Sequence, residues 1–277
     1  MPIKAEFHCH SNASDGKLTP YDVVKRAHKN DVSILALTDH DITLGLDEAS
    51  DAAKEFNIEF IPGIELSCEH KGSTVHVLGY FKDNNYKNPE LQKFLNELKA
   101  SRIARAKKIV DNLKKHFNIH INHNEVLKKG NGVVARPHIA ESILEAGYDY
   151  PWEYIFEKFI GNDSPAYVPN QKISVEEGIT LLKKYNALTI LAHPKLIKKC
   201  PISEVLAFPF DGIEAVYFQN FKRETEFFLS HARKNNMLIT CGSDFHGINE
   251  NDEKHGDIGD MSIDDADLEK FLKALKS

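Results

Sequence analysis

Histidines and carboxylates recur in short clusters along the chain, and their types and spacing are those of metal ligands. The first cluster is His8-Cys9-His10, followed by Asp15. Because residues i and i+2 of a strand point to the same face, His8 and His10 can bind one metal ion. For this motif taken alone, two hydrogen-bonded core histidines remain an open alternative.

Two further clusters follow apolar runs. Thr38-Asp39-His40-Asp41 comes directly after Ile34–Leu37, where a buried strand would end, and Glu65 lies among apolar neighbours. Charge at the carboxyl end of a barrel strand is typical of an active site, because barrel enzymes place their catalytic residues there. An ordinary polar loop is the alternative explanation for the Asp-His-Asp run.

The remaining clusters supply four candidates from later strands: His76, His193, Asp244 and His246. A lone strand histidine such as His76 is more often a core residue than a ligand, so the conjunction carries the argument. Together the clusters place nine nitrogen and oxygen side chains at predicted strands: His8, His10, Asp15, His40, Glu65, His76, His193, Asp244 and His246. One zinc ion needs about four ligands, so this set suits two or three Mn, Fe or Zn ions, with Glu65 as a bridge.

Strands alternating with helices must position these side chains, which favours a parallel, barrel-like α/β fold. The predicted strands are Ala5–His10, Ser33–Thr38, Glu59–Pro62, Thr74–Tyr80, Ala187–Ala192, Gly212–Phe218 and Met237–Gly242. Helices are predicted at Pro20–Asn30, Gly45–Phe56, Ser174–Lys184 and Lys222–Asn235. Thr19 before Pro20 is a typical N-cap, and Ser174 with Glu177 fits a capping box.

One region lacks this alternation. Residues 89–168 show no strand pattern; a long amphipathic helix is predicted at Pro89–Phe117, with shorter helices at His123–Lys128, Pro137–Glu145 and Tyr150–Phe159. We therefore expect a metal-binding barrel formed by residues 1–88 and 169–277. Residues 89–168 would be a helical insertion that caps the site.

Bulk composition limits the possible partners. The 277 residues carry a net charge of -6, which excludes a protein that coats nucleic acid through an overall positive field. No apolar run is long enough to span a membrane. The four cysteines (Cys9, Cys68, Cys200 and Cys241) form no C-x-x-C pair, as expected for reduced thiols in the cytoplasm. No pattern indicates a stable protein partner.

The ordered motifs H-x-H…SDG, TDHD, GIE-S, H-LGY, AHP and GSDFHG resemble those of the polymerase and histidinol phosphatase (PHP) superfamily. The similarity is greatest to small stand-alone members that are nucleoside 3′,5′-bisphosphate phosphatases or 5′→3′ exoribonucleases. This resemblance implies a distorted (β/α)7 barrel with a helical insertion. It also implies that His8, His10, Glu65 and Asp244 hold one metal, that Asp15, His40, Glu65 and His246 hold a second or third, and that His76 and His193 complete the set.

The resemblance further implies a metal-dependent phosphoesterase acting on a small nucleotide or a short RNA. The family has an R-P-H element like Arg136-Pro137-His138, so Arg136 and His138 are candidates to bind a second phosphate, whereas a surface arginine is the alternative. Asp39 and His138 are candidates to protonate the leaving oxygen, and Asn220 to contact a base or sugar. A histidinol-phosphate-type phosphatase and a catalytically silent metal-binding module remain alternatives.

Overall fold

The computed structural model describes residues 3–130, 134–169, 172–248 and 254–277. Its centre is a sheet whose strands are hydrogen-bonded in this order: β1 (Ala5–Glu6), β2 (Ile34–Leu37), β3 (Glu59–His70), β4 (Ser73–Phe81), β6 (Ala187–Leu191), β7 (Gly212–Tyr217) and β8 (Leu238–Gly242). A short strand, β5 (Ile173–Ser174), pairs with β3. The seven strands of the main path confirm the expected distorted β/α barrel.

The sheet curls until its two edges meet. The amide of Asp244 donates to the carbonyl of His8 (2.9 Å), and the amide of His10 donates to the carbonyl of Phe245 (2.8 Å). These bonds join the segment after β1 to the segment after β8. The barrel is therefore closed at the end where the candidate ligands of both segments lie.

The expectation of a wholly parallel barrel is wrong at one strand. β4 runs antiparallel to both β3 and β6, whereas the other main neighbours are parallel. The cause is the connection: Lys71 and Gly72 join β3 to β4 directly, and both have positive φ (49° and 75°). Two such residues form a tight hairpin turn, which can only join antiparallel strands.

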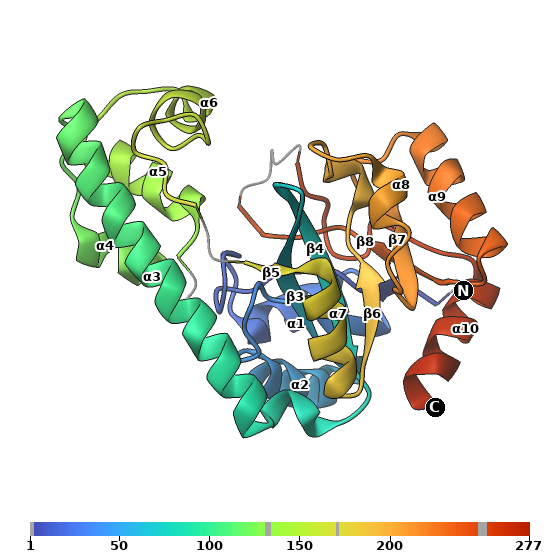
Figure 1. Cartoon of the computed structure of the whole chain (residues 1–277). Coiled ribbons are helices and arrows are strands. Elements are labelled where there is room, and N and C mark those ends of the chain that lie inside the picture. Colours follow the sequence, from blue (N-terminus) through green and yellow to red (C-terminus); the bar gives the residue numbers. More distant parts are fainter. Residues whose placement is uncertain (1–2, 131–133, 170–171, 249–253) are drawn as a thin grey trace.

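Helices cover the outside of the barrel (Figure 1). They are α1 (Pro20–Lys29), α2 (Leu46–Phe56), α7 (Val175–Lys184), α8 (Ile202–Val205), α9 (Lys222–Lys234) and α10 (Asp265–Lys276), with short 3-10 turns η1 (Asn84–Lys87) and η3 (Pro194–Leu196). Both expected helix starts are confirmed. Thr19 caps α1 by accepting from the amide of Asp22 (3.1 Å), and Ser174 and Glu177 form the reciprocal capping box of α7.

An aromatic cluster fills the barrel below the candidate ligands. Phe271 of α10 lies 4.7 Å from Phe7 and 5.2 Å from Tyr80 between ring centroids, in edge-to-face contacts. The Tyr80 hydroxyl donates to the carbonyl of Phe7 (2.8 Å). Since all three residues are fully buried, they fix the backbone immediately before His8.

Residues between β4 and β5 form helices with a hydrophobic cluster of their own. They are α3 (Pro89–Phe117), α4 (His123–Lys129), α5 (Arg136–Glu145), α6 (Trp152–Tyr154) and the π-helical η2 (Ile155–Phe159). The first turns of α3 pack on the barrel through Leu91 and Leu95. Its later turns pack with the other helices through residues such as Leu113 and Ile139, to one side of the barrel (Figure 1). The helices expected between Pro89 and Phe159 are present, and the described part of this region contains no strand.

None of the described helices combines the length and the apolar composition that crossing a membrane requires.

Candidate metal centre

The nine candidate ligands come together at the end of the barrel where the parallel strands terminate. His8 and His10 follow β1, and the chain then loops through Asp15. The others lie as follows: His40 after β2, Glu65 within β3, His76 within β4, His193 after β6, and Asp244 and His246 after β8. Residues distant in sequence therefore become neighbours because closure of the barrel brings the strand ends together.

One group of side chains converges beside Oε2 of Glu65. Nε2 of His8 and Nε2 of His10 lie 3.2 Å and 3.1 Å from this oxygen. The same two nitrogens lie 3.4 Å and 3.2 Å from Oδ1 of Asp244. Four side chains from three strands thus present ligand atoms to one point.

A second group faces the other oxygen of the same carboxylate. Oε1 of Glu65 lies 2.7 Å from Nδ1 of His76 and 2.9 Å from Nε2 of His193. These two nitrogens are 3.3 Å apart. Glu65 therefore stands between two groups of imidazoles and has the placement of a bridging ligand.

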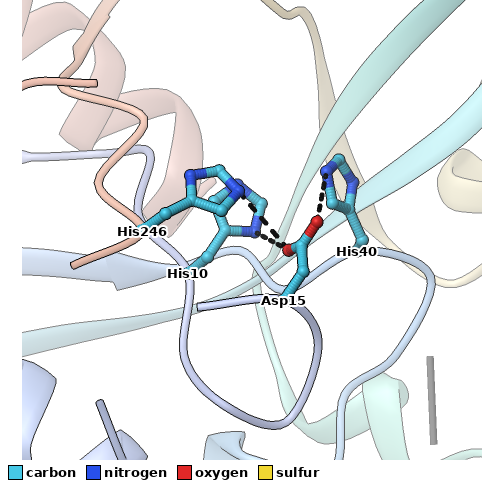
Figure 2. Close-up of side chains that lie close together, drawn as sticks. All are labelled: His10, Asp15, His40 and His246. Carbon is cyan, nitrogen blue, oxygen red and sulfur yellow. Dashed lines mark ion pairs between the residues drawn. The ribbon is translucent and has the colours of Figure 1, made fainter. Parts of the chain in front are cut away.

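The third group is built around Asp15 (Figure 2). Its Oδ1 lies 3.4 Å from Nε2 of His246 and 3.8 Å from Nδ1 of His10. Its Oδ2 faces His40, with Nε2 at 3.8 Å. Nδ1 of His40 lies 3.0 Å from Glu65, so this ring connects the third group to the bridging carboxylate.

Several of these ligand atoms are buried and unsatisfied. Within the described residues, the following have no hydrogen-bond partner: Nε2 of His8, both ring nitrogens of His10, Nδ1 of His40, Oδ1 of Asp15 and Oε2 of Glu65. Buried polar atoms without partners are costly unless something else satisfies them. Divalent cations would take these lone pairs, and a set of imidazoles and carboxylates is the donor set of Mn, Fe or Zn. The residues therefore fit a metal centre.

The charges of the cluster also favour a metal centre. Burial alone would raise the pKa of Glu65, but the imidazoles of His40 and His76 hold this pKa well below its usual value. Burial alone would lower the pKa of His10, but Asp244 and Glu65 raise it to about 10. The carboxylates thus keep their negative charge, and a divalent cation would neutralise them in place of the imidazole protons.

A carboxylate that the sequence analysis missed orients two ligands. Glu214 of β7 is fully buried, with Oε1 2.9 Å from Nδ1 of His8 and Oε2 accepting from the amide of His193 (2.7 Å). Holding Nδ1 of His8 in this way turns its Nε2 toward Glu65. One signal was available: Gly212-Ile213-Glu214 repeats the triplet Gly63-Ile64-Glu65.

Close packing around Glu214 and His8 explains why residue 242 is a glycine. A Cβ on Gly242 would collide with Oε1 of Glu214 and with Cβ of His8. Two residues later the backbone of Asp244 is left-handed (φ 54°), a conformation that costs a non-glycine residue about 1–3 kcal/mol. The Tyr217 hydroxyl also donates to Oδ2 of Asp244 (3.1 Å). The ligand after β8 is therefore held in one orientation by its surroundings.

His255 is a second residue that spacing did not reveal. Its ring lies 4.3 Å from that of His246, and its ring nitrogens fall within ligand distance of Asp244 and His246. It belongs to the polar stretch that follows β8, where neither a strand pattern nor a motif distinguishes it.

Asp39 lies beside the metal centre but supports the loop instead of lining a cavity. Its Oδ1 accepts from the amide of Ser11 (2.8 Å) and from the Ser14 hydroxyl (2.5 Å), and its Oδ2 accepts from the Ser11 hydroxyl (2.6 Å). Burial raises its pKa. All these bonds go to the loop that carries Asp15.

Asn220 is also placed away from the cavities described below. Its amide nitrogen donates to the carbonyl of Ala215 (3.0 Å), so the side chain closes the turn after β7. The structure does not bring this side chain to the other candidate site residues.

Two cavities open on the ligand cluster, and both are lined by Asp15, His40, His76 and His193. The smaller, here called the inner cavity, has a volume of about 230 Å³ and is also lined by Pro137, His138, Trp152, Leu196 and Ile248. The larger, here called the basic cleft, has a volume of about 590 Å³ and is also lined by Arg102, Arg105, Arg136, Lys172, Lys198 and Lys199. The helical segment thus contributes to the walls of both.

The cations of the basic cleft lie close enough to repel one another. Arg102 pairs with Asp41, but Arg105 donates to the carbonyl of Val168 (2.7 Å) and Arg136 to Oδ1 of Asn162 (3.2 Å). Burial, then repulsion from Arg136, lowers the pKa of Arg105 to about 10.

Lys172 also lines the basic cleft and is repelled by its arginines. Its amine donates to the Thr74 hydroxyl, and burial, then repulsion from Arg102, lowers its pKa to about 8. Across the described residues, no carboxylate forms an ion pair with Arg105, Arg136 or Lys172. Six cations line the cleft together with only two carboxylates, Asp15 and Glu69, and this excess of positive charge is suited to an anion that arrives with the substrate.

His138 lines the inner cavity at the start of α5 and is almost fully buried. Its Nδ1 accepts from the amide of Ala135 (3.0 Å), and burial lowers its pKa. A neutral imidazole whose Nδ1 accepts must carry its proton on Nε2. The side chain is therefore a hydrogen-bond donor at the edge of the metal centre.

Comparison with known proteins gives a consistent result. A model of the PHP domain matches residues 6–242. The chain is 32% identical to a 5′-3′ exoribonuclease of Haemophilus influenzae, over 89% of this chain and 91% of the relative. It is 29% identical to a 3′,5′-nucleoside bisphosphate phosphatase of Chromobacterium violaceum, over 92% of both chains. A solved structure from Bifidobacterium adolescentis, described as a metal-dependent phosphoesterase, superimposes with a TM-score of 0.84 at 27% identity, covering 99% of this chain and 97% of the other.

Proposed function

The chain belongs to the PHP family and is a metal-dependent phosphoesterase, and from this premise we propose that its substrates are nucleotides with two phosphate groups. The substrate class is either nucleoside 3′,5′-bisphosphates or short 5′-phosphorylated RNA. The names of the two relatives support this choice. The observation that carries it is the group of Arg105, Arg136 and Lys172 in the basic cleft, which adjoins the ligand cluster and forms no ion pair with a carboxylate among the described residues.

We propose that the three groups of ligands hold two or three divalent ions of the Mn, Fe or Zn kind. Glu65 would be shared between the group of His8, His10 and Asp244 and the group of His76 and His193. Asp15, His40 and His246 would form the remaining site. Such ions activate water as a nucleophile and offset the negative charge of a phosphate under attack.

A second phosphate would bind in the basic cleft. Arg136 and Arg105 present guanidinium groups without carboxylate partners, and Lys172 adds a compact charge on the same wall. Hydrogen bonds from arginine to phosphate are charge-assisted and frequently bidentate, so they favour a substrate with a second phosphate over a simple monoester. The same contact would place the scissile phosphate at the metals.

His138 would donate a hydrogen bond to the reacting group. The side chain lines the inner cavity and carries its proton on Nε2, so it would stabilise a phosphate oxygen or protonate the leaving alkoxide. Asp39 is less suited to this task, because both of its oxygens are engaged by Ser11 and Ser14.

We propose that residues 89–168 act as a cap domain on the barrel of residues 1–88 and 169–277. Two observations support this division: the helices have their own hydrophobic cluster, and they supply Arg105, Arg136, His138 and Trp152 to the cavities. A cytoplasmic location stays a prediction, which is consistent with four buried cysteines that form no disulfide.

The test is phosphate release from a panel of substrates in the presence of Mn²⁺. The panel holds adenosine 3′,5′-bisphosphate, AMP, histidinol phosphate and a 5′-phosphorylated trinucleotide, with products resolved by chromatography. We expect the bisphosphate or the trinucleotide to be the best substrate, and the Glu65→Ala variant to be inactive on all four.

Each alternative has its own outcome. Activity confined to histidinol phosphate would replace the nucleotide proposal with a small-molecule phosphatase. A protein that binds metal but shows no Glu65-dependent turnover of any compound would be a silent metal-binding module.

A further inference from the structure

The two cavities meet at the ligand cluster but have walls of different chemistry. The basic cleft is lined by six cations, of which Arg105, Arg136 and Lys172 form no ion pair with a carboxylate among the described residues. The inner cavity has one cation outside the ligand set, Lys17, and it is paired with Glu141 at 2.6 Å. Beyond the ligand cluster, four apolar residues line it: Pro137 and Leu196, which also line the basic cleft, and Trp152 and Ile248, which line the inner cavity alone. The polar residues of this part are His138, Glu141 and His255. Away from the metal centre, the part of the inner cavity that Trp152 and Ile248 line is therefore poorly suited to a second phosphate and well suited to an uncharged ring.

A phosphate monoester would leave this second cavity without an occupant. In a nucleoside 3′,5′-bisphosphate the base, the sugar and the 5′-phosphate all lie on the leaving side of the scissile phosphorus. A phosphodiester has a further substituent on the other side, the 5′-linked nucleoside of the next residue. Two cavities that share the residues of one metal centre match the two substituents of a diester.

We propose that the inner cavity binds the nucleoside that follows the scissile phosphate, with its base stacked on Trp152. This inference rests on the proposed function and selects the phosphodiester from the two substrate classes. Water adds its oxygen to phosphorus, and the bond from phosphorus to the 3′-oxygen of the first nucleotide breaks. The 3′-oxygen takes up a proton. The phosphate stays on the 5′-oxygen of the second nucleoside, which becomes the new 5′ end.

Trp152 is placed to act as a stacking platform. It begins α6 directly after Pro151, and its ring packs on Phe156 with 5.3 Å between centroids. The ring is only partly buried by the cluster of the helical segment, so one part remains to line the cavity. A rigid aromatic side chain stacks on any base, because every base has a π-face.

The barrel side of the cavity offers matching apolar groups. Leu196 and Ile248, from the segments after β6 and β8, are 38% and 45% exposed. Neither belongs to the cores of fully buried residues, although both line the cavity beside ligands. A base inserted between these side chains and Trp152 would cover all three from water.

The kinetic test compares substrates that differ only beyond the scissile phosphate. They are pApA, adenosine 3′,5′-bisphosphate and the methyl ester of its 3′-phosphate, which is a diester without a second nucleoside. For Trp152→Ala we expect the ratio of kcat/KM for pApA to that for the methyl ester to fall about tenfold, as loss of one base stack predicts. The Trp152→Phe variant, which keeps an aromatic face, should restore most of this ratio.

A second measurement does not depend on turnover. Trp152 is the only tryptophan of the chain, so its fluorescence reports on this cavity alone. An uncleavable pApA, with a methylene group in place of the bridging 3′-oxygen, should quench this fluorescence on binding to the Mn²⁺-loaded protein. The corresponding bisphosphate analogue should bind with much less quenching.

The outcomes separate the inference from the function on which it rests. Hydrolysis of the bisphosphate without cleavage or binding of pApA would overturn the inference and leave the phosphoesterase proposal intact. Equal losses on all three substrates in Trp152→Ala would also overturn it, because they would indicate a structural role. Failure of all three substrates with the wild-type protein would overturn the proposed function itself.

Discussion

The barrel rim and the helical segment reach the same two cavities in opposite ways. The rim contributes side chains from strand ends, and these contact one another and are mostly buried, as His8, His10 and Glu65 show. The helical segment contributes Arg136 and Trp152 from helix starts, and these side chains keep part of their surface open to a cavity.

This difference assigns the chemical step to the rim and the selection of substrates to the helical segment. A buried carboxylate such as Glu65 contacts imidazoles from several strands, so a change there disturbs every group at once. A cleft residue such as Arg136 donates hydrogen bonds to Asn162 and to the carbonyl of Ile160 and contacts none of the candidate ligands among the hydrogen bonds of the described residues, so a change there should alter which substrate fits. The two regions are joined by an ion pair between Arg102 of α3 and Asp41 of the rim.

The largest effect should come from Glu65→Gln on the rim. The amide keeps the shape of the side chain but loses the charge that bridges two groups of ligands. We expect kcat to fall by at least about a thousandfold, the upper end of the cost of removing one preorganised electrostatic group. Metal content measured by plasma mass spectrometry should fall together with turnover. Full metal content with full activity would contradict the bridging role.

Arg102→Met should show how firmly the helical segment is attached to the rim. Asp41 is 3% exposed, and without Arg102 it would lose its ion-pair partner and keep only the hydrogen bond from the amide of Ser67. We expect a loss of about 3 kcal/mol in the free energy of unfolding, measured by urea denaturation. The double variant Asp41→Asn, Arg102→Met should recover part of the loss. If both proteins unfold like the wild type, the ion pair does not couple the two regions.

Arg136→Ala should change substrate preference more than chemistry. Losing charge-assisted hydrogen bonds to a second phosphate should raise KM for adenosine 3′,5′-bisphosphate about tenfold or more. The matched variant is Arg136→Lys, which keeps the charge but not the bidentate geometry, and should give an intermediate KM. An equal loss on a monoester with one phosphate would show that Arg136 supports the fold and not the second phosphate.

The smallest effect should be a pH dependence that Lys172 introduces. Burial and neighbouring cations lower the pKa of Lys172 to about 8, so its charge is present below that pH and lost as the pH rises through it. KM for the bisphosphate should therefore increase several-fold between about pH 7.5 and 9.

The control for this prediction is Lys172→Met. Its KM should already be high at pH 7.5 and should rise less with pH. In the free protein, the lowered pKa means that unfolding takes up a proton between about pH 8 and 10.5. The wild type should consequently gain stability relative to Lys172→Met across that window.

The sequence alone was sufficient for the barrel and for the histidines and carboxylates that gather at its rim. H-x-H spacing on a strand and apolar runs that end in Asp-His or His-Pro are local patterns, and barrel closure brings strand ends together whatever the details. The helices of residues 89–168 could also be predicted from local sequence, since caps and apolar periodicity define them.

What the tertiary structure decided is which side chains meet. The antiparallel direction of β4, the support that Asp39 gives to the loop of Asp15, and the contact of Glu214 with His8 all depend on partners far away in the chain. The grouping of the ligands around the two oxygens of Glu65 depends on them as well. The R-P-H element indicated Arg136 and His138, but the two cavities themselves could not be predicted, because these residues and Trp152 line them only when the helical segment packs against the barrel. Local patterns determine the chemistry that each residue can offer, whereas long-range packing determines which residues can contact the same substrate.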